Sequence, residues 1–326
     1  MKTRLKSIIQ KFHKAKILVV GDLILDEFIW GKVERISPEA PVPVVWVNSE
    51  SFMPGGASNV ANNIAALGGK GIIAGIIGDD RNGKLLIGEL EKRNVDTSGV
   101  VIDAERPTTL KTRIIAHHQQ VVRVDREKSG AIEDNLLEQI LCFVREKIAV
   151  IDAIVIEDYG KGVVIPRLLA EVISLAKKHK KIITVDPKVS HFSYYRGVTA
   201  ITPNEQEAQS AAGVKIQDDG GINKVGKKLL KELELDSVLI TLGENGMRLF
   251  EKKGTVTHIP TVAQEVFDVS GAGDTVIAAF TLALASGATK LEAAHLANFA
   301  AGIVVSKVGT AVSTREELLD KIDNKG

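Results

Sequence analysis

The C-terminal part of the chain contains a run of residues whose types and spacing suit phosphate chemistry. It reads Asp-Val-Ser-Gly-Ala-Gly-Asp-Thr at 268–275 and leads into apolar residues at helical spacing over 276–285. The first N–H groups of a helix lack intrahelical acceptors and attract anions. Gly271 and Gly273 would let a phosphoryl group approach this backbone closely. The run therefore predicts an anion site at a helix N-terminus.

Asp274, the last residue of the Gly-Ala-Gly-Asp sequence, would repel phosphate if binding were its only task. A carboxylate beside a bound phosphoryl group makes more chemical sense as a general base that accepts the proton of an attacking hydroxyl. The simpler alternative is an N-terminal helix cap, a common position for Asp. The small residues Gly271, Ala272 and Gly273 favour the catalytic interpretation, with Asp274 as the base.

A second glycine-rich run lies far earlier in the chain. It reads Pro-Gly-Gly-Ala-Ser-Asn at 54–59 and opens a helix of small and apolar residues. We expect Gly55 and Gly56 to act as a hinge and Asn59 to face the cleft.

The elements that must position these residues follow an α/β rhythm. Helices are predicted near 134–147 and 166–178, and the predicted strands are 16–20, 153–157, 182–186, 200–202 and 238–241. Such alternation indicates a mostly parallel sheet, whose ligands bind beyond the carboxyl ends of its strands. Those ends carry Gly21-Asp22, Glu157-Asp158, Asp186, Asn204 and Gly243. Two β-rich segments, 37–54 with four prolines and 108–126, predict a small protruding sheet.

Composition excludes several classes of protein. The 326 residues are 44% hydrophobic and carry a formal net charge of +1, so we expect a globular protein without affinity for nucleic acid. The single cysteine, Cys142, lies in a helical apolar pattern and cannot form an internal disulfide. We find no secretion signal and no apolar run of membrane-spanning length, and we expect a cytoplasmic protein that does not bind membranes.

The two glycine runs, their order and the intervening α/β rhythm resemble the signatures of the ribokinase-like (PfkB) carbohydrate kinases over nearly the whole chain. The resemblance implies one domain, 1–326, with a three-layer α/β/α core, a mostly parallel central sheet and a protruding β lid formed by segments near 32–54 and 107–126. It further implies ATP and Mg²⁺ as cofactors, a sugar as substrate and a homodimer assembled through the lid. In some relatives a monovalent cation tightens the anion hole.

The same resemblance assigns roles to individual residues. Asp274 would be the base, and Gly271, Ala272 and Gly273 the anion hole. The nucleotide and its magnesium would contact Asn204, Glu207 (to Mg²⁺ through water), Asp186, Lys188, Thr241, Gly243, Gly246 and Asn298. The sugar would contact Asp22, Asp26, Gly55, Gly56 and Asn59.

Within this family, the run Arg-Ile-Ser-Pro-Glu-Ala-Pro-Val-Pro-Val-Val at 35–45 resembles that of the heptose 7-phosphate kinases. The run Asp-Tyr-Gly-Lys-Gly at 158–162 shows the same resemblance. The resemblance implies phosphorylation of the anomeric hydroxyl of D-glycero-D-manno-heptose 7-phosphate for lipopolysaccharide precursors. We expect the following nucleotidyltransferase step to come from a separate enzyme or from a region removed from this chain. The cations expected at the 7-phosphate are Arg113, Arg123 and Arg126 on the lid strands, or Arg35, whereas Arg106 and Lys111 are less well placed by pattern.

Three rival interpretations remain. A ribokinase or phosphofructokinase-like enzyme would keep the fold and differ over 35–45, and a non-catalytic sugar sensor would not need the base at 274. A nicotinamide-dependent dehydrogenase would need glycines linking a strand to a helix, but the glycines at 69–71 precede a strand.

Overall fold

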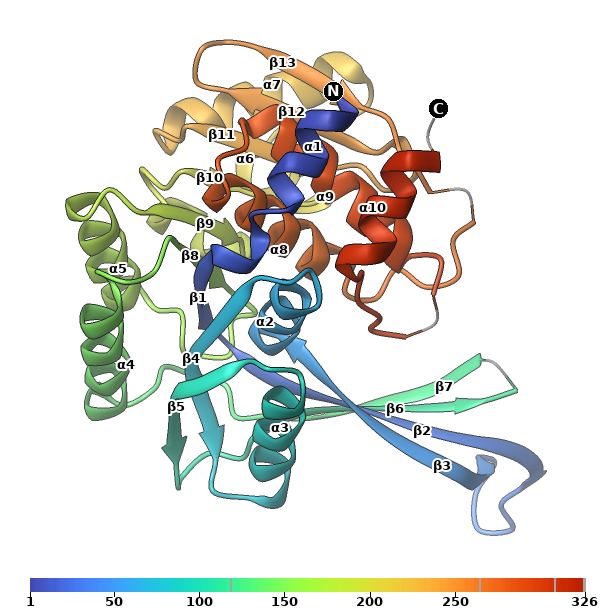
Figure 1. Cartoon of the computed structure of the whole chain (residues 1–326). Coiled ribbons are helices and arrows are strands. Elements are labelled where there is room, and N and C mark those ends of the chain that lie inside the picture. Colours follow the sequence, from blue (N-terminus) through green and yellow to red (C-terminus); the bar gives the residue numbers. More distant parts are fainter. Residues whose placement is uncertain (118, 264, 308, 325–326) are drawn as a thin grey trace.

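The computed structural model describes residues 1–117, 119–263, 265–307 and 309–324. Its main body contains a nine-stranded sheet in the order β13-β12-β11-β10-β9-β8-β1-β4-β5 (Figure 1). The strands from β11 to β5 are parallel, and β12 and β13 add an antiparallel edge. The strands are β1 Lys16–Gly21, β4 Lys70–Gly78, β5 Asp96–Asp103, β8 Ala153–Glu157, β9 Ile182–Asp186, β10 Ala200–Ile201, β11 Ser237–Thr241, β12 Met247–Glu251 and β13 Val256–Ile259. The predicted α/β class with a mostly parallel sheet is confirmed.

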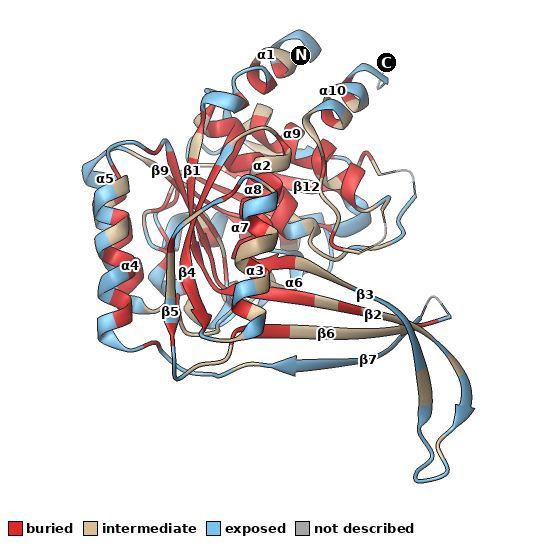
Figure 2. Cartoon of the chain, turned by 60° about the horizontal axis from the view of Figure 1, so that its bottom comes forward, coloured by how far each residue is buried: buried red, intermediate tan, exposed pale blue. Residues whose placement is uncertain are grey.

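Helices cover both faces of this sheet because successive strand residues point to opposite sides. Ile17 and Val19 of β1 pack in one core with helices α1, α2, α3, α8, α9 and α10, whereas Leu18 and Val20 pack in another with α4 to α7. The buried residues in Figure 2 gather between these layers. The helices are α1 Lys2–Ile9, α2 Ala57–Ala66, α3 Arg81–Lys92, α4 Asp134–Lys147, α5 Pro166–Lys178, α6 Glu205–Ala212, α7 Asp219–Glu232, α8 Ala272–Ala285, α9 Lys290–Val304 and α10 Arg315–Asn324.

A second sheet protrudes from the body and is called the lid sheet below (Figure 1). Its four strands lie in the order β3-β2-β6-β7, and β2 pairs antiparallel with β3 and parallel with β6. Their bounds are β2 Leu23–Ile36, β3 Pro43–Gly56, β6 Thr109–Ala116 and β7 Gln119–Arg126. The strands begin closer to the core than the predicted segment 32–54, because β2 starts at Leu23, directly after the end of β1.

The two faces of the lid sheet differ in chemistry. Cross-strand pairing places Asp26, Lys111 and Asp125 side by side on one face. The other face carries the pairs Ile29–Ile114 and Ile114–Val122, with Val124 nearby. Val122 and Val124 are exposed.

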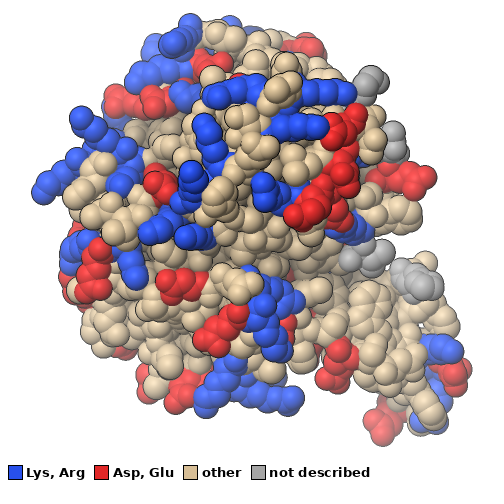
Figure 3. Space-filling view, viewed as in Figure 1, with Lys and Arg blue, Asp and Glu red and all other residues tan. Residues whose placement is uncertain are grey.

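The surface carries charged side chains of both signs. On the face shown in Figure 3, basic and acidic side chains are interspersed over the body. Among the described residues, no helix is both long and apolar enough to cross a bilayer.

Candidate active site

Asp274 lies in the first turn of α8, where the glycine run becomes a helix. Gly271 is the N-cap and adopts a left-handed conformation with φ +75°, which glycine tolerates. The Asp274 side chain is buried at 4% exposure. Within the described part of the chain, the N–H groups of Gly273 and Asp274 form no backbone hydrogen bond, whereas that of Ala272 donates to Val269 at 3.2 Å. The free donors of the expected anion hole are thus the amides that follow Ala272.

Two side chains from distant segments donate hydrogen bonds to the Asp274 carboxylate. Asn59 Nδ2 lies 2.6 Å from Oδ2, and the Tyr159 hydroxyl lies 3.0 Å from Oδ1. The Asn59 amide is oriented in turn by Asn63, which donates to its Oδ1 at 3.2 Å, and Asn63 accepts from Thr275 at 2.9 Å. Helices α2 and α8 therefore fix the carboxylate between them, and both donors favour its ionised form.

Burial has the opposite effect and dominates the pKa of Asp274. Removal from water raises this pKa to about 6, although the hydrogen bonds from Asn59 and Tyr159 lower it. The charge of Asp26 raises it further, and Lys111 lowers it. A carboxyl group that titrates near neutral pH is well matched to general-base chemistry.

Glu157 and Asp186 form an acidic pair beside this carboxylate. They end the adjacent parallel strands β8 and β9 and are register partners. Oxygens of Glu157, Asp186 and Asp274 lie within 4.8 Å of one another. Burial raises the pKa of both Glu157 and Asp186, and each feels the charge of Asp274. Neither carboxylate oxygen of Glu157 has a hydrogen-bond partner among the described residues, so the cluster could accept a divalent cation.

Asn204 and Glu207 form a capping box at the start of α6. Asn204 Oδ1 accepts from the Glu207 amide at 2.9 Å, and the Glu207 carboxylate accepts from the Asn204 amide at 2.9 Å. Burial raises the pKa of Glu207, while Lys188 lowers it, and the charge of Glu207 raises the pKa of Asp186. This electrostatic coupling places the Asn-x-x-Glu element next to the acidic pair.

A cavity of about 530 Å³ adjoins the first turn of α8. Its walls include four residues that the sequence assigned to nucleotide binding, namely Thr241, Gly243, Gly246 and Asn298, together with Ala272 and Gly273. Asn298 is buried and donates to the Pro260 carbonyl at 2.8 Å, so its amide helps to hold the cavity wall. Met247, Val266, Val276 and Val305 make the remaining lining apolar enough for a planar base.

The charged face of the lid sheet approaches Asp274 from the other side. Arg113 forms an ion pair with Asp26 at 2.6 Å and lies over the Phe28 ring at 5.3 Å. Lys111 Nζ lies 5.1 Å from the centre of the Tyr159 ring. Its ammonium forms no ion pair or hydrogen bond with the side chains and backbone that the structure describes, and burial lowers its pKa. Gly55 belongs here as well, since a Cβ there would lie 2.6 Å from Asp26 Oδ2.

Three of the residues expected to bind sugar phosphate have other surroundings. Arg123 pairs with Asp125 on its own strand at 2.9 Å, and Arg35 is exposed towards the outer end of β2. Asp22 is 1% exposed, and its carboxylate accepts the amides of Tyr159, Lys161 and Val163 at 3.0, 2.9 and 3.1 Å. Asp22 therefore orders the loop that carries Tyr159, and its expected role as a second sugar ligand stays a prediction.

The sequence reasoning assigned no role to Tyr159, Glu157 or Asn63. Glu157 could have been found, because it ends a strand predicted to lie beside the strand that ends in Asp186. Asn63 lies one helical turn after Asn59, a spacing that places both on one face of α2. Tyr159 lies in the run 158–162 that resembles the heptose 7-phosphate kinases, but nothing in this run indicates that its hydroxyl reaches Asp274.

Comparison with known proteins gives consistent results. The sequence model of the pfkB family carbohydrate kinases matches residues 14–317. The chain is 48% identical over 302 residues to the bifunctional protein HldE of Geobacter metallireducens, covering 93% of this chain and 62% of that protein. For HldE of Helicobacter pylori the identity is 47% over 303 residues, covering 93% and 65%. The chain thus spans under two thirds of the length of these relatives.

Solved structures establish the fold. The phosphofructokinase-2 of Escherichia coli in complex with potassium superimposes with a TM-score of 0.79 at 20% identity, covering 95% of this chain and 98% of that one. The ribokinase of Arabidopsis thaliana complexed with ribose and ATP superimposes with a TM-score of 0.75 at 21% identity. The match covers 94% of this chain and 98% of that one. The predicted ribokinase-like fold is confirmed.

Proposed function

The chain belongs to the pfkB family of carbohydrate kinases, and we propose that it transfers the γ-phosphoryl group of ATP to the anomeric hydroxyl of D-glycero-D-manno-heptose 7-phosphate. The identity with HldE proteins and the 35–45 run support the sugar. One observation carries the chemistry: a single helix turn joins a nucleotide-sized cavity, through Ala272 and Gly273, to a buried carboxylate. That carboxylate is close enough to the lid sheet for the charges of Asp26 and Lys111 to act on its pKa.

In this proposal the nucleotide base occupies the cavity, and its phosphates extend towards the start of α8. The free N–H groups of Gly273 and Asp274, together with the helix dipole, stabilise negative charge on the phosphoryl group during transfer. Asp274 accepts the proton of the sugar hydroxyl, while Asn59 and Tyr159 hold its carboxylate in place.

The acidic residues next to Asp274 fit a bound magnesium ion. Glu207, through water, and the unpaired carboxylate oxygens of Glu157 beside Asp186 would hold it. When bound, Mg²⁺ neutralises phosphate charge. Lys188, whose charge lowers the pKa of Glu207, lies where it would add a further cation near the phosphates.

The apolar face of the lid sheet favours a homodimer in which two lids pack against each other. Val47, Val122 and Val124 of this face are 54%, 44% and 53% exposed, and a partner lid would bury them. Closure of the lid over the sugar would exclude water from the reacting phosphoryl group.

Release of ADP in the presence of a panel of sugars tests the function. We expect turnover with heptose 7-phosphate, and the panel should contain both of its anomers, ribose and fructose 6-phosphate. Turnover of ribose alone would overturn the proposed substrate.

Lys111 is the residue that the structure favours for the distant phosphate of this substrate, because Arg113 and Arg123 already have carboxylate partners. We expect Lys111→Ala to raise KM for heptose 7-phosphate by about 10- to 100-fold, the range for a lost charged hydrogen bond. KM for unphosphorylated heptose should stay unchanged. The matched control is Lys147→Ala, since Lys147 also lies over an aromatic ring, that of Phe143 on α4. Equal effects on both sugars would refute this role.

A substitution at Gly302 tests whether the cavity binds the nucleotide. Gly302 lines the cavity on α9, and a Cβ there would lie 2.7 Å from Val262 Cγ2 and 3.3 Å from the Ala263 nitrogen. We expect Gly302→Ala to displace this wall and to raise KM for ATP by about tenfold, as overpacking by about 1–3 kcal/mol would do. KM for the sugar should not change. Gly88→Ala on α3 is the control because its Cβ would meet nothing within 4 Å. An unchanged KM for ATP would place the nucleotide elsewhere.

A further inference from the structure

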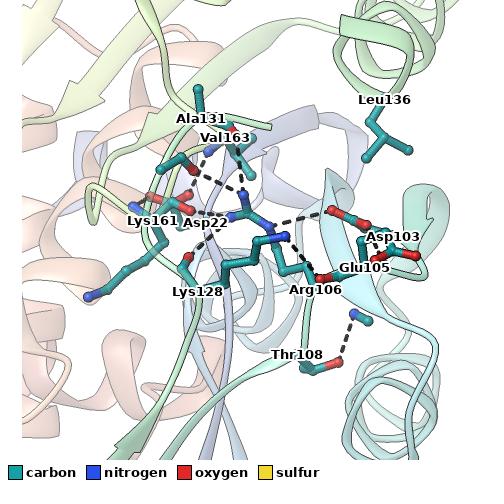
Figure 4. Close-up of polar contacts among 12 residues, drawn as sticks. Asp22, Asp103, Glu105, Arg106, Thr108, Lys128, Ala131, Leu136, Lys161 and Val163 are labelled. Carbon is teal, nitrogen blue, oxygen red and sulfur yellow. Dashed lines mark hydrogen bonds and ion pairs between the residues drawn. The ribbon is translucent and has the colours of Figure 1, made fainter. Parts of the chain in front are cut away.

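Arg106 lies between β5 and β6, at the base of the lid sheet, and its side chain is largely buried. Figure 4 shows its guanidinium between Asp103 on one side and Lys161 and Ala131 on the other. It forms an ion pair with Asp103 at 3.5 Å, and both side chains are 9% exposed. A buried guanidinium is costly unless its donors are satisfied. Among the described residues, Nε meets only the Asp103 carboxylate and has no hydrogen-bond acceptor, so the acceptors of the other two nitrogens show what Arg106 does.

The backbone that carries Arg106 is anchored to the main sheet. Thr108 donates from its amide and its hydroxyl to Asp80 at 2.9 and 2.8 Å, and its hydroxyl accepts from the Gly78 amide at 2.9 Å. A Cβ at Gly78, at the end of β4, would lie 2.4 Å from the Arg106 carbonyl oxygen. The backbone of Arg106 is therefore held in place by the end of β4.

The Arg106 guanidinium donates hydrogen bonds to backbone carbonyl groups of two separate segments. One acceptor is Lys161 at 2.6 Å, in the loop 158–163, and another is Gly130 at 2.9 Å, in the segment that follows β7. Weaker bonds of 3.4 Å reach Lys128 and Ala131. The Lys161 and Gly130 carbonyls are both acceptors and cannot bond to each other, whereas the forked guanidinium donates to both.

The two segments touch where they meet Arg106. A Cβ at Gly162, which has φ +102°, would lie 1.9 Å from the Gly130 carbonyl oxygen. The amide of Ile132 donates to the Gly162 carbonyl at 3.1 Å. The position of the loop 158–163 is thus coupled to the base of β7.

The same loop carries the hydroxyl that holds Asp274. Its amides at Tyr159, Lys161 and Val163 donate to Asp22, and the Tyr159 side chain reaches Asp274 at 3.0 Å. Arg106 does not touch Asp274 and acts at a distance, through the backbone of this loop.

We propose that Arg106 is a positioning residue that clamps the loop 158–163 to the base of the lid sheet and so keeps Tyr159 on Asp274. The catalytic consequence rests on the proposed function of Asp274, whereas the clamp itself does not. Arg106 thereby links the lid to the catalytic carboxylate, in addition to the Lys161–Glu127 ion pair at 2.7 Å.

A double-mutant cycle tests the catalytic consequence. We expect Arg106→Lys and Tyr159→Phe each to lower kcat by about 10- to 100-fold, the range for a lost hydrogen bond to a charged group, with KM for ATP unchanged. The double variant should be no slower than the slower single variant, because both act on one contact. Additive losses, or a KM for ATP that rises with the fall in kcat, would overturn the proposal.

Hydrogen exchange tests the clamp without any sugar. Arg106→Lys should speed exchange of the amides of Tyr159, Lys161 and Val163, whereas the control Arg145→Lys, on the surface of α4, should not. If Arg106→Lys does not fold, Asp103→Asn takes its place, because it keeps Arg106 but removes the ion-pair partner. It should speed exchange of the same three amides by a smaller factor. Unchanged exchange in the folded variant would refute the clamp. Faster exchange in a protein that phosphorylates no sugar would instead refute only the proposed function.

Discussion

Replacing Asp274 with Asn should lower kcat by about 10²- to 10⁴-fold, the usual effect of removing a general base. The amide keeps the shape of the carboxylate but cannot accept the proton of the sugar hydroxyl. KM for ATP should not change, because the cavity is lined by Ala272 and Gly273 and not by the Asp274 side chain. Steady-state kinetics with both substrates varied measure the two effects separately.

Two controls accompany this variant. Asp134→Asn changes a carboxylate in the first turn of α4, whose side chain is 87% exposed, and should leave kcat unchanged. The melting temperature of Asp274→Asn should be no lower than that of the unaltered protein. Burial raises the pKa of Asp274, so ionisation of its carboxyl group opposes folding above its ordinary pKa. Turnover close to that of the unaltered protein would remove Asp274 from the mechanism.

The pH dependence of kcat follows from the same carboxylate. The pKa of Asp274 is raised to about 6 by burial, against the hydrogen bonds from Asn59 and Tyr159 and against the charge of Lys111. The negative charge of Asp26 raises it further. Only the ionised form accepts a proton, so kcat should fall by about tenfold per pH unit below this pKa.

Gly271→Ala should be the second most damaging change, with a loss in kcat of about 10²-fold. A Cβ at Gly271 would lie 2.7 Å from Asn59 Nδ2, the atom that donates to Asp274. The displaced amide would lose a charged hydrogen bond worth about 1.5–3 kcal/mol. The left-handed backbone at φ +75° adds about 1–2 kcal/mol of strain for alanine. The loss should appear in kcat measured with saturating substrates.

Gly287→Ala separates the effect of backbone strain from the effect of the contact with Asn59. Gly287 follows the other end of α8 and also has a positive φ, +87°, but its Cβ would meet nothing within 4 Å. It should lower the melting temperature through strain and leave kcat unchanged. If both variants lower kcat equally, the contact with Asn59 is not the reason.

Much of the core could be predicted because its periodicity is strong. The helices at 134–147 and 166–178 and the strands at 153–157 and 182–186 occur at the predicted positions. Asp274 and Asn59 could be predicted as partners in one site because glycine runs at two helix starts mark close backbone approaches. In the structure, Asn59 Nδ2 lies 2.6 Å from Asp274 Oδ2.

The lid contacts could not be predicted, since they depend on strand register and loop path. Parallel pairing of β2 with β6 sets Lys111 beside Asp26 and Arg113 beside Phe28, and no local pattern encodes that register. Tyr159 reaches Asp274 across 115 positions of sequence by way of a loop whose course is set by Asp22 and Arg106. Sequence reasoning therefore favoured arginines for the phosphate where the structure favours Lys111.

The phosphorus NMR spectrum of the product formed from D-glycero-D-manno-heptose 7-phosphate and magnesium ATP tests the central claim most directly. The account predicts a second phosphate ester that couples to the anomeric proton, equimolar ADP, and neither product with Asp274→Asn. An unconsumed heptose phosphate, in a preparation that phosphorylates ribose or fructose 6-phosphate, would contradict the proposed substrate. The same second ester formed rapidly by Asp274→Asn would contradict the proposed base.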